Sequence, residues 1–312
     1  MNRFPRRCCA WTLTLAACFA GCSGGAPPTP LATSGPSAED LLVDAAWLNA
    51  HLPDADLVVL DVRTAEEYAA GHVPGAVSLP HVSTYDSDEA RINDLAPVSQ
   101  IEELFGQAGV DQQTPVVVYD GRDYREAGRI FWTLEVHGHQ NVKVLNGGYG
   151  DWTARGLPVS TTAATPAPRK FVANLEPRRL ASKLRVLRSI GKQSVTILDV
   201  RSQEEYLGQK SEAARAGHIP SAVQVDFQVS LRRDGGVCYL KGIDDLRSAY
   251  AGVCADCAVI TYCNTGTRAS ASYLALRLLG REVAVYDGAW TEWASDPSLP
   301  IEVAPPAPAV TR

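Results

Sequence analysis

The sequence contains two copies of one pattern, and this duplication limits the possible folds more than any other feature. Residues 57–79 read LVVLDVRTAEEYAAGHVPGAVSL, and residues 195–225 read VTILDVRSQEEYLGQKSEAARAGHIPSAVQV. A second matching pair begins with PVVVYDGRDYREAGR at residue 115 and with AVITYCNTGTRASAS at residue 258. Each copy alternates strand-like and helix-like stretches and closes on a tryptophan-containing helix, so the chain is predicted to hold two similar domains.

The alternation of strands and helices predicts an α/β fold. The runs LVVLDV and VTILDV are almost continuously apolar, which is typical of parallel strands that are buried on both faces. We therefore expect two domains, each a parallel sheet with helices on both faces. The predicted boundaries are 38–160 for the first domain, 161–171 for a linker rich in Thr, Ala and Pro, and 172–303 for the second domain.

The N-terminus has the features of an export signal. Residues 1–22 combine a basic start with an apolar stretch that is too short to span a membrane, and they resemble a bacterial lipoprotein signal. Acylation is expected at Cys18 or Cys22, and an ordinary secretory peptide is the alternative. Residues 23–37 are predicted to be a flexible tether, and 304–312 a disordered tail.

These features predict an exported protein that a lipid holds at a membrane surface, in the periplasm or elsewhere in the cell envelope. Neither Phe19 nor Ser23 is the aspartate that resembles an inner-membrane retention signal. We therefore expect anchoring at the outer membrane if the organism has one.

Composition excludes some partners. Apolar residues make up 46% of the chain and charged residues 21%, as in globular proteins, and the net charge of −6 disfavours nucleic acid as the main partner. No cofactor is predicted. The CADC stretch at 254–257 lacks two further ligands at suitable spacing, so no metal site is predicted either, and the pair is expected to be a disulfide or a redox-active dithiol.

The strongest candidate for chemistry is Cys263. It follows the strand-like AVITY and precedes a run with apolar residues at i, i+3, i+4 and i+7, which predicts an amphipathic helix that ends near Gly280. A cysteine at this position faces the unpaired amides of a helix N-terminus, an environment that favours the thiolate. The sequence therefore predicts a nucleophile at the carboxyl edge of a parallel sheet.

The residues after Cys263 are predicted to cradle an anion. Gly266 allows the backbone to close around a bound sulfur atom, and Arg268 adds a fixed positive charge. Cysteine phosphatases use a C-x5-R loop that is sized for phosphate, whereas this loop is C-x4-R and suits a single sulfur atom better. The predicted binding residues are Asn264, Thr265, Gly266, Thr267 and Arg268.

The tandem LDVR, EEY and GH(V/I)P frames, the YCNTGTR loop and the closing DGAWTEWA resemble the rhodanese family of two-domain sulfurtransferases. The resemblance covers residues 40–301. It implies that Cys263 takes a sulfane sulfur from a donor such as thiosulfate and passes it, as a persulfide, to a nucleophile such as cyanide or a thiol. The main alternative is a persulfide carrier or partner-binding module without turnover, and a 3-mercaptopyruvate sulfurtransferase and a phosphatase or arsenate reductase are further alternatives behind it.

Several other polar residues are assigned structural tasks. The first copy has Asp120 where the second has Cys263, so it is predicted to be non-catalytic. We expect the first copy's three helix arginines on a solvated face, with the domain cleft as the alternative. Glu204 and Glu205 are expected to repel an anionic donor and to leave its binding to Arg268 and the loop amides. Ion pairs or caps, structural histidines and packing tryptophans are expected at Asp61, Arg63, Asp199, Arg201, His72, His218, Trp152, Trp290 and Trp293.

Overall fold

The computed structural model describes residues 41–88 and 94–303. The predicted signal peptide, tether and C-terminal tail, including Cys18 and Cys22, lie outside these residues. Within the described ranges, no helix is both long and apolar enough to cross a membrane.

The first sheet is parallel throughout and has five strands in the order β1-β5-β4-β2-β3. Its central strand β4 reads VVVY and is fully buried, as a strand with helices on both faces should be. The strands are β1 (Leu42–Val43), β2 (Val58–Asp61), β3 (Val77–Ser78), β4 (Val116–Tyr119) and β5 (Val142–Leu145).

The second sheet repeats this arrangement, with five parallel strands in the order β6-β12-β11-β7-β8. Strand for strand, the order matches that of the first sheet, so the predicted duplication is confirmed at the level of topology. The strands are β6 (Leu180–Ala181), β7 (Val195–Asp199), β8 (Val223–Gln224), β11 (Ala258–Tyr262) and β12 (Val283–Tyr286).

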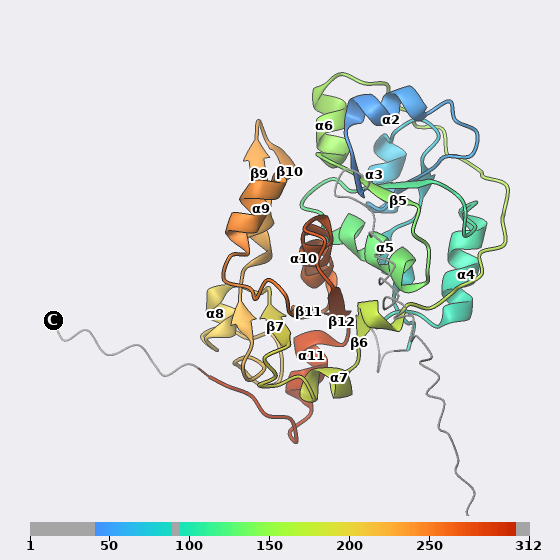
Figure 1. Ribbon diagram of the computed structural model, residues 1–312. Helices are drawn as coiled ribbons and strands as arrows, with labels where there is room; N and C mark the ends of the chain where they lie inside the picture. The colour runs from blue at the N-terminus through green and yellow to red at the C-terminus, as the bar shows by residue number, and fades with distance from the viewer. Residues whose placement is uncertain (1–40, 89–93, 304–312) are drawn as a thin grey trace, which may run out of the picture. The chain divides into compact units, whose positions relative to one another are not determined.

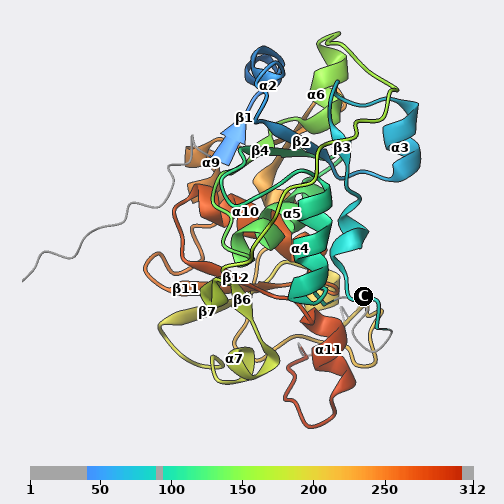
Figure 2. The same cartoon turned by 90° about the vertical axis from the view of Figure 1, so that its right-hand side faces the viewer.

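Helices cover both faces of each sheet (Figures 1 and 2). In the first domain, α2 (Ala45–His51) and α6 (Gly148–Ala154) cover one face, and α4 (Val98–Gln107) and α5 (Arg125–Val136) cover the other. In the second domain, the corresponding pairs are α7 (Lys183–Leu187) with α11 (Ala289–Ser295), and α9 (Ile243–Ala249) with α10 (Thr267–Leu278).

The shorter elements complete the two domains. The antiparallel hairpin of β9 (Leu231–Asp234) and β10 (Val237–Leu240) occurs in the second domain and was not predicted from the sequence. In the part of the chain that the structure describes, the remaining elements are α3 (Ala65–Ala70), α8 (Gln203–Tyr206) and the short 3₁₀ helices η1 (His81–Thr84), η3 (Pro177–Arg179) and η4 (Phe227–Ser230). Residues 161–176, which include the predicted linker, form no helix or strand.

Helices α5 and α10 pack against each other across the two domains (Figures 1 and 2). They come close because Gly128 has no side chain: a Cβ there would lie 2.8 Å from the carbonyl oxygen of Ser270. The helix predicted here forms and ends near Gly280, but its residues 269–278 are all buried, so the prediction that it is amphipathic is wrong. Some polar residues of α10 contact the first domain: Arg277 forms an ion pair with Glu135, and Thr267 Oγ1 lies 3.0 Å from the Tyr85 hydroxyl.

The repeated LDVR motif has the same structural role in both copies. Arg63 pairs with Asp61 at 2.5 Å and donates to the Gly71 carbonyl at 2.8 Å. Arg201 likewise pairs with Asp199 at 2.6 Å and donates to the Gly217 carbonyl at 2.8 Å. Because the copy with the cysteine and the copy without it share these contacts, the buried pairs have a structural task and hold the loop that follows α3 or α8.

The histidines and tryptophans also have structural contacts, as expected. The Nδ1 atoms of His72 and His218 lie 2.8 Å from the carbonyl oxygens of Tyr68 and Tyr206. The three tryptophans named above each donate the indole N–H to a backbone carbonyl, at Pro158, Arg215 and Pro300 for Trp152, Trp290 and Trp293.

The four cysteines of the described residues fall into two kinds. Cys254 and Cys257, at the start of β11, form a disulfide with their Cα atoms 5.4 Å apart. Cys238 and Cys263 are free and buried. Because the disulfide lies at the opposite end of β11 from Cys263, it does not take part in the loop described next.

Candidate active site

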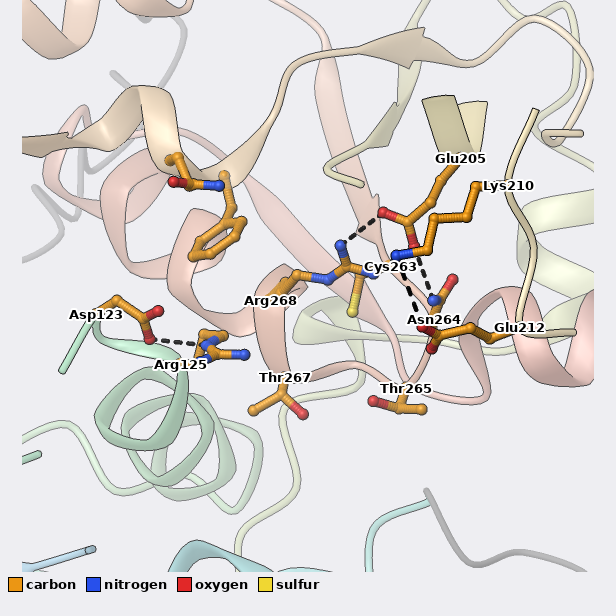
Figure 3. Close-up of a pocket in the computed structure, with 12 residues that line it drawn as sticks. Asp123, Arg125, Glu205, Lys210, Glu212, Cys263, Asn264, Thr265, Thr267 and Arg268 are labelled. Carbon is orange, nitrogen blue, oxygen red and sulfur yellow. Dashed lines mark hydrogen bonds and ion pairs between the residues drawn. The ribbon is translucent and has the colours of Figure 1, made fainter. Parts of the chain in front are cut away.

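Cys263 lies at the carboxyl end of β11, the strand that pairs with both β7 and β12 in the second sheet. Its residue is only 1% exposed, yet it lines a cavity of about 480 Å³. The thiol therefore borders an opening large enough for a small molecule, and Figure 3 shows it among the other residues that line this opening. This is the edge of an α/β sheet where ligands bind.

The backbone around Cys263 forms a tight turn into α10. Gly266 caps the helix with φ of +85°, a conformation that side chains other than glycine rarely adopt. The carbonyls of Cys263 and Asn264 accept hydrogen bonds from the backbone amides of Trp290 and Thr291. Among the described residues, none accepts a hydrogen bond from the amides of residues 264–266. These amides are therefore available to an anion beside the thiol.

The first domain supports this turn from behind. A Cβ on Gly266 would lie 3.0 Å from Asp287 Oδ1 and 3.1 Å from Arg129 Nη1. Arg129, from α5 of the first domain, is fully buried and forms an ion pair with Asp287 of the second. The Leu95 amide also donates to Asp287, at 2.6 Å. The loop conformation thus depends on contacts from the domain that lacks the cysteine.

The expectation that the first copy's helix arginines lie on a solvated face holds for only one of them. Arg122 is exposed and pairs with Glu67 at 3.2 Å. Arg129 is instead buried in the interdomain contact, and Arg125 lines the Cys263 cavity. The reason is that α10 covers α5, so most of that helix has no solvated face.

Arg268 is held by Glu205 rather than free for a donor. Its Nη1 and Nη2 atoms donate to the two carboxylate oxygens of Glu205 at 2.8 and 2.9 Å, and the Asn264 amide donates to the same carboxylate at 2.8 Å. Burial alone would raise the pKa of Glu205, but the hydrogen bonds from Arg268 and from the Ser202 amide lower it to about 2. Glu205 therefore neutralises the loop's own cation.

The expectation that Glu204 and Glu205 would repel a donor is thus modified by the structure. Glu204 is exposed, whereas Glu205 is only 5% exposed. The negative charge of Glu205 is balanced by its ion pair with Arg268. Burial opposes the charged form of Arg268, but its hydrogen bonds with Glu205 and the nearby Cys263 raise its pKa. The guanidinium remains a cation that is fixed beside the sulfur atom.

The structure places the six predicted site residues in the loop after β11 and the first turn of α10, and it adds others from elsewhere in the chain. Thr267 Oγ1 lies 3.0 Å from the hydroxyl of Tyr85 in the first domain, and Thr265 lines the cavity. Three carboxylates and three cations share the lining, so its formal charges balance. Arg125 was expected there only as the alternative to a solvated face, and the lining residues that sequence reasoning missed are Asp123, Lys210, Glu212, Phe227 and Gln228.

The corresponding loop of the first copy has no nucleophile. Asp120 follows β4 as Cys263 follows β11, and its carboxylate accepts from the amides of Arg122 and Ala127 at 3.2 Å each. Burial raises the pKa of Asp120 to about 6. An aspartate in this position fills the space of an anion and carries no sulfur. Within residues 41–88 and 94–303, no group of three or more metal-binding side chains could hold a metal ion.

Comparison with known proteins identifies the fold and the family. The model of the rhodanese-like domain matches residues 44–155 and again 182–296. The thiosulfate sulfurtransferase of Azotobacter vinelandii is 33% identical over 264 residues, which cover 84% of this chain and 97% of that protein. The sulfur carrier protein TtuD of Thermus thermophilus is 30% identical over 279 residues, which cover 84% of this chain and 96% of TtuD.

Among solved structures, SseA from Escherichia coli, a 3-mercaptopyruvate sulfotransferase with the rhodanese fold, superposes with a TM-score of 0.72 at 29% identity. The match covers 80% of this chain and 98% of SseA. Two family matches, two sheets of one topology and a cysteine loop at the edge of the second sheet lead to the same conclusion. The chain belongs to the rhodanese family of sulfurtransferases and carries the rhodanese-like domain twice.

Proposed function

We propose that this protein moves a sulfane sulfur from thiosulfate, or a related anionic donor, to cyanide or a thiol through a persulfide on Cys263. The observation that carries the proposal is the position of a free cysteine at the bottom of a cavity, beside backbone amides that have no partner among the described residues. Such amides stabilise a thiolate and then the terminal, anionic sulfur of a persulfide. The thiosulfate sulfurtransferase relative supports the choice of donor.

The reaction has two steps. The Cys263 thiolate attacks the outer sulfur of thiosulfate, a new S–S bond forms on the enzyme, and the S–S bond of the donor breaks with release of sulfite. Cyanide then attacks the terminal sulfur of the persulfide, thiocyanate leaves, and the thiolate returns. The charges balance in both steps, and neither needs an external oxidant, reductant or cofactor. Each step is a displacement at sulfur, typical of covalent catalysis with two half-reactions.

The experiment follows both steps on the purified protein. We expect mass spectrometry after thiosulfate treatment to show one added sulfur atom on the Cys263 peptide, and added cyanide to remove it as thiocyanate with repeated turnover. Loading that is followed by a single release would support the alternative, a sulfur carrier such as the relative TtuD is named to be. Turnover with 3-mercaptopyruvate but not with thiosulfate would mean that 3-mercaptopyruvate, and not thiosulfate, is the donor. No loading from either would reject the persulfide.

We also propose that the mature protein is a cell-envelope lipoprotein, acylated at Cys18 or Cys22 and held at the outer membrane if the organism has one. Support comes from the basic start, short apolar stretch and small residues before each cysteine. Radiolabelled palmitate should enter the wild-type protein in its native host and be lost from either Cys18→Ala or Cys22→Ala, but not from both. Failure of the wild type to take up label would reject lipidation.

A further inference from the structure

The cavity around Cys263 contains three cations, each of which lies beside a carboxylate, so they differ in which of their nitrogen atoms remain without a partner among the described residues. Arg268 is bound by both oxygens of Glu205. Lys210 has its Nζ atom 3.9 Å from a carboxylate oxygen of Glu212, and both side chains are more than half exposed. Charges in water that lie beside an opposite charge contribute little to binding. A dianionic donor therefore needs another cation.

Arg125 is that third cation, and it comes from the domain without the cysteine. It begins α5, and its Nε donates to Asp123 at 2.7 Å. Its guanidinium carbon lies 6.0 Å from the ring centre of Phe227, which belongs to the second domain. Among the described residues, none accepts a hydrogen bond from Nη1 or Nη2 of Arg125. Figure 3 shows Arg125 across the opening from the Cys263 loop.

These contacts preorganise Arg125 for an oxyanion. The bond to Asp123 fixes the Nε side of the guanidinium, and the aromatic ring lies near the guanidinium group. The remaining N–H groups form the fork that matches two oxygens of a sulfonate or carboxylate. The side chain is 40% exposed, so a donor can reach it from solvent. Asp123 lowers the net charge of the pair that it forms with Arg125, but it leaves Nη1 and Nη2 of Arg125 without a partner in the described part of the chain.

We propose that Arg125 binds the oxyanion end of the sulfur donor while the donor's outer sulfur meets Cys263. The assignment rests on the proposed sulfurtransferase function. In the first step, Cys263 forms the new S–S bond, the donor's S–S bond breaks, and its electron pair leaves with the sulfite that Arg125 holds. The non-catalytic domain thereby supplies a donor-binding residue in addition to supporting the loop. Anionic donors are favoured over neutral ones.

The test compares two variants with two donors of different charge. Arg125→Gln removes the cation, and Arg122→Gln makes the same change at an exposed arginine outside the cavity. The donors are thiosulfate, a dianion, and methanethiosulfonate, a monoanion that transfers the same outer sulfur and releases methanesulfinate. Cyanide is the acceptor. In a double-displacement reaction, kcat/KM for the donor reports the first half-reaction alone.

We expect Arg125→Gln to lower kcat/KM for thiosulfate by about tenfold, which is the order of one charge-assisted hydrogen bond. Because a Coulomb energy is proportional to charge, kcat/KM for methanethiosulfonate should fall by only about threefold. Neither value should change in Arg122→Gln. The value of kcat/KM for cyanide, which reports the second half-reaction, should change much less than that for thiosulfate.

Other results would overturn the assignment. An equal loss with both donors and with cyanide would make Arg125 a residue that only supports the fold, and no loss with either donor would remove it from the binding site. Both outcomes require a wild-type protein that turns over. A wild type that accepts no sulfur from either donor would instead reject the proposed function itself, so the two failures are distinguishable.

Discussion

Cys263→Ser is expected to abolish thiocyanate formation, lowering kcat by more than about 10³-fold, to the background rate. A serine hydroxyl fits the same space but stays protonated at neutral pH and does not form a stable bond to a transferred sulfur atom. The loop amides, Arg268 and the cavity would all remain, so the loss would measure the nucleophile alone. The measurement is thiocyanate release under saturating thiosulfate and cyanide, together with peptide mass spectrometry after donor treatment.

The chain itself offers a matched control. Cys238 is the other free cysteine of the described residues, is 7% exposed and lies in β10 outside the lining of the cavity. Burial raises the pKa of its thiol, which disfavours the reactive thiolate. Cys238→Ser should therefore keep both sulfur loading and turnover. Persistent turnover in Cys263→Ser, or an added sulfur on the Cys238 peptide, would contradict the assignment of the nucleophile.

Much of the fold and the position of the nucleophile could be predicted because their signals are local or repeated. The duplicated LDVR and GHxP frames predicted two parallel sheets of equal topology. The strand, cysteine, glycine and helix pattern of residues 258–280 predicted a thiol at a sheet edge, and Cys263 lies there. These patterns involve residues that are close together in the sequence, so their spacing is enough to predict the local structure.

The rest of the cavity could not be predicted because it depends on contacts between distant segments. Asp123 and Arg125 line the Cys263 cavity because α5 packs on α10, and no local spacing encodes that contact. The amphipathic character expected for α10 was wrong for the same reason, because α5 of the other domain packs against it. One signal was present for Lys210 and Glu212: ten residues separate Tyr206 from Gly217, where two separate Tyr68 from Gly71. That insertion occurs in the copy with the cysteine.

The pairing of Glu205 with Arg268 was also within reach of sequence reasoning. Glu205 follows β7 and Arg268 follows β11, and the two strands are neighbours in the sheet. Because parallel neighbouring strands end at one edge, the side chains that follow them are expected to meet. The sequence-based expectation considered Glu205 only as a charge that repels a donor, and it did not consider Arg268 as its neighbour. The correction changes the expected role of Arg268 from free donor-binding cation to a cation held in an ion pair.

Glu205→Gln is therefore expected to lower the free energy of unfolding at pH 7 by about 2 kcal/mol after allowance for solvent screening, because the hydrogen bonds from Arg268, the Ser202 amide and Asn264 hold the pKa of Glu205 near 2 rather than 4.5. The glutamine leaves a buried guanidinium without its countercharge. Urea unfolding, followed by tryptophan fluorescence, measures the difference. Glu204→Gln makes the same charge change one residue earlier, at an exposed side chain, and should leave the midpoint unchanged.

The pH dependence separates the ion pair from other effects of the substitution. Since the folded-state pKa of Glu205 lies below the unfolded value, the wild type holds this stabilisation above pH 4.5 and loses it as the pH falls toward 2. The difference in free energy of unfolding between wild type and Glu205→Gln should therefore become smaller over that range and stay constant between pH 5 and pH 8. A gap that persists unchanged at the lowest pH at which both proteins fold would mean that Glu205 stabilises the site through packing, and that its charge does not hold Arg268.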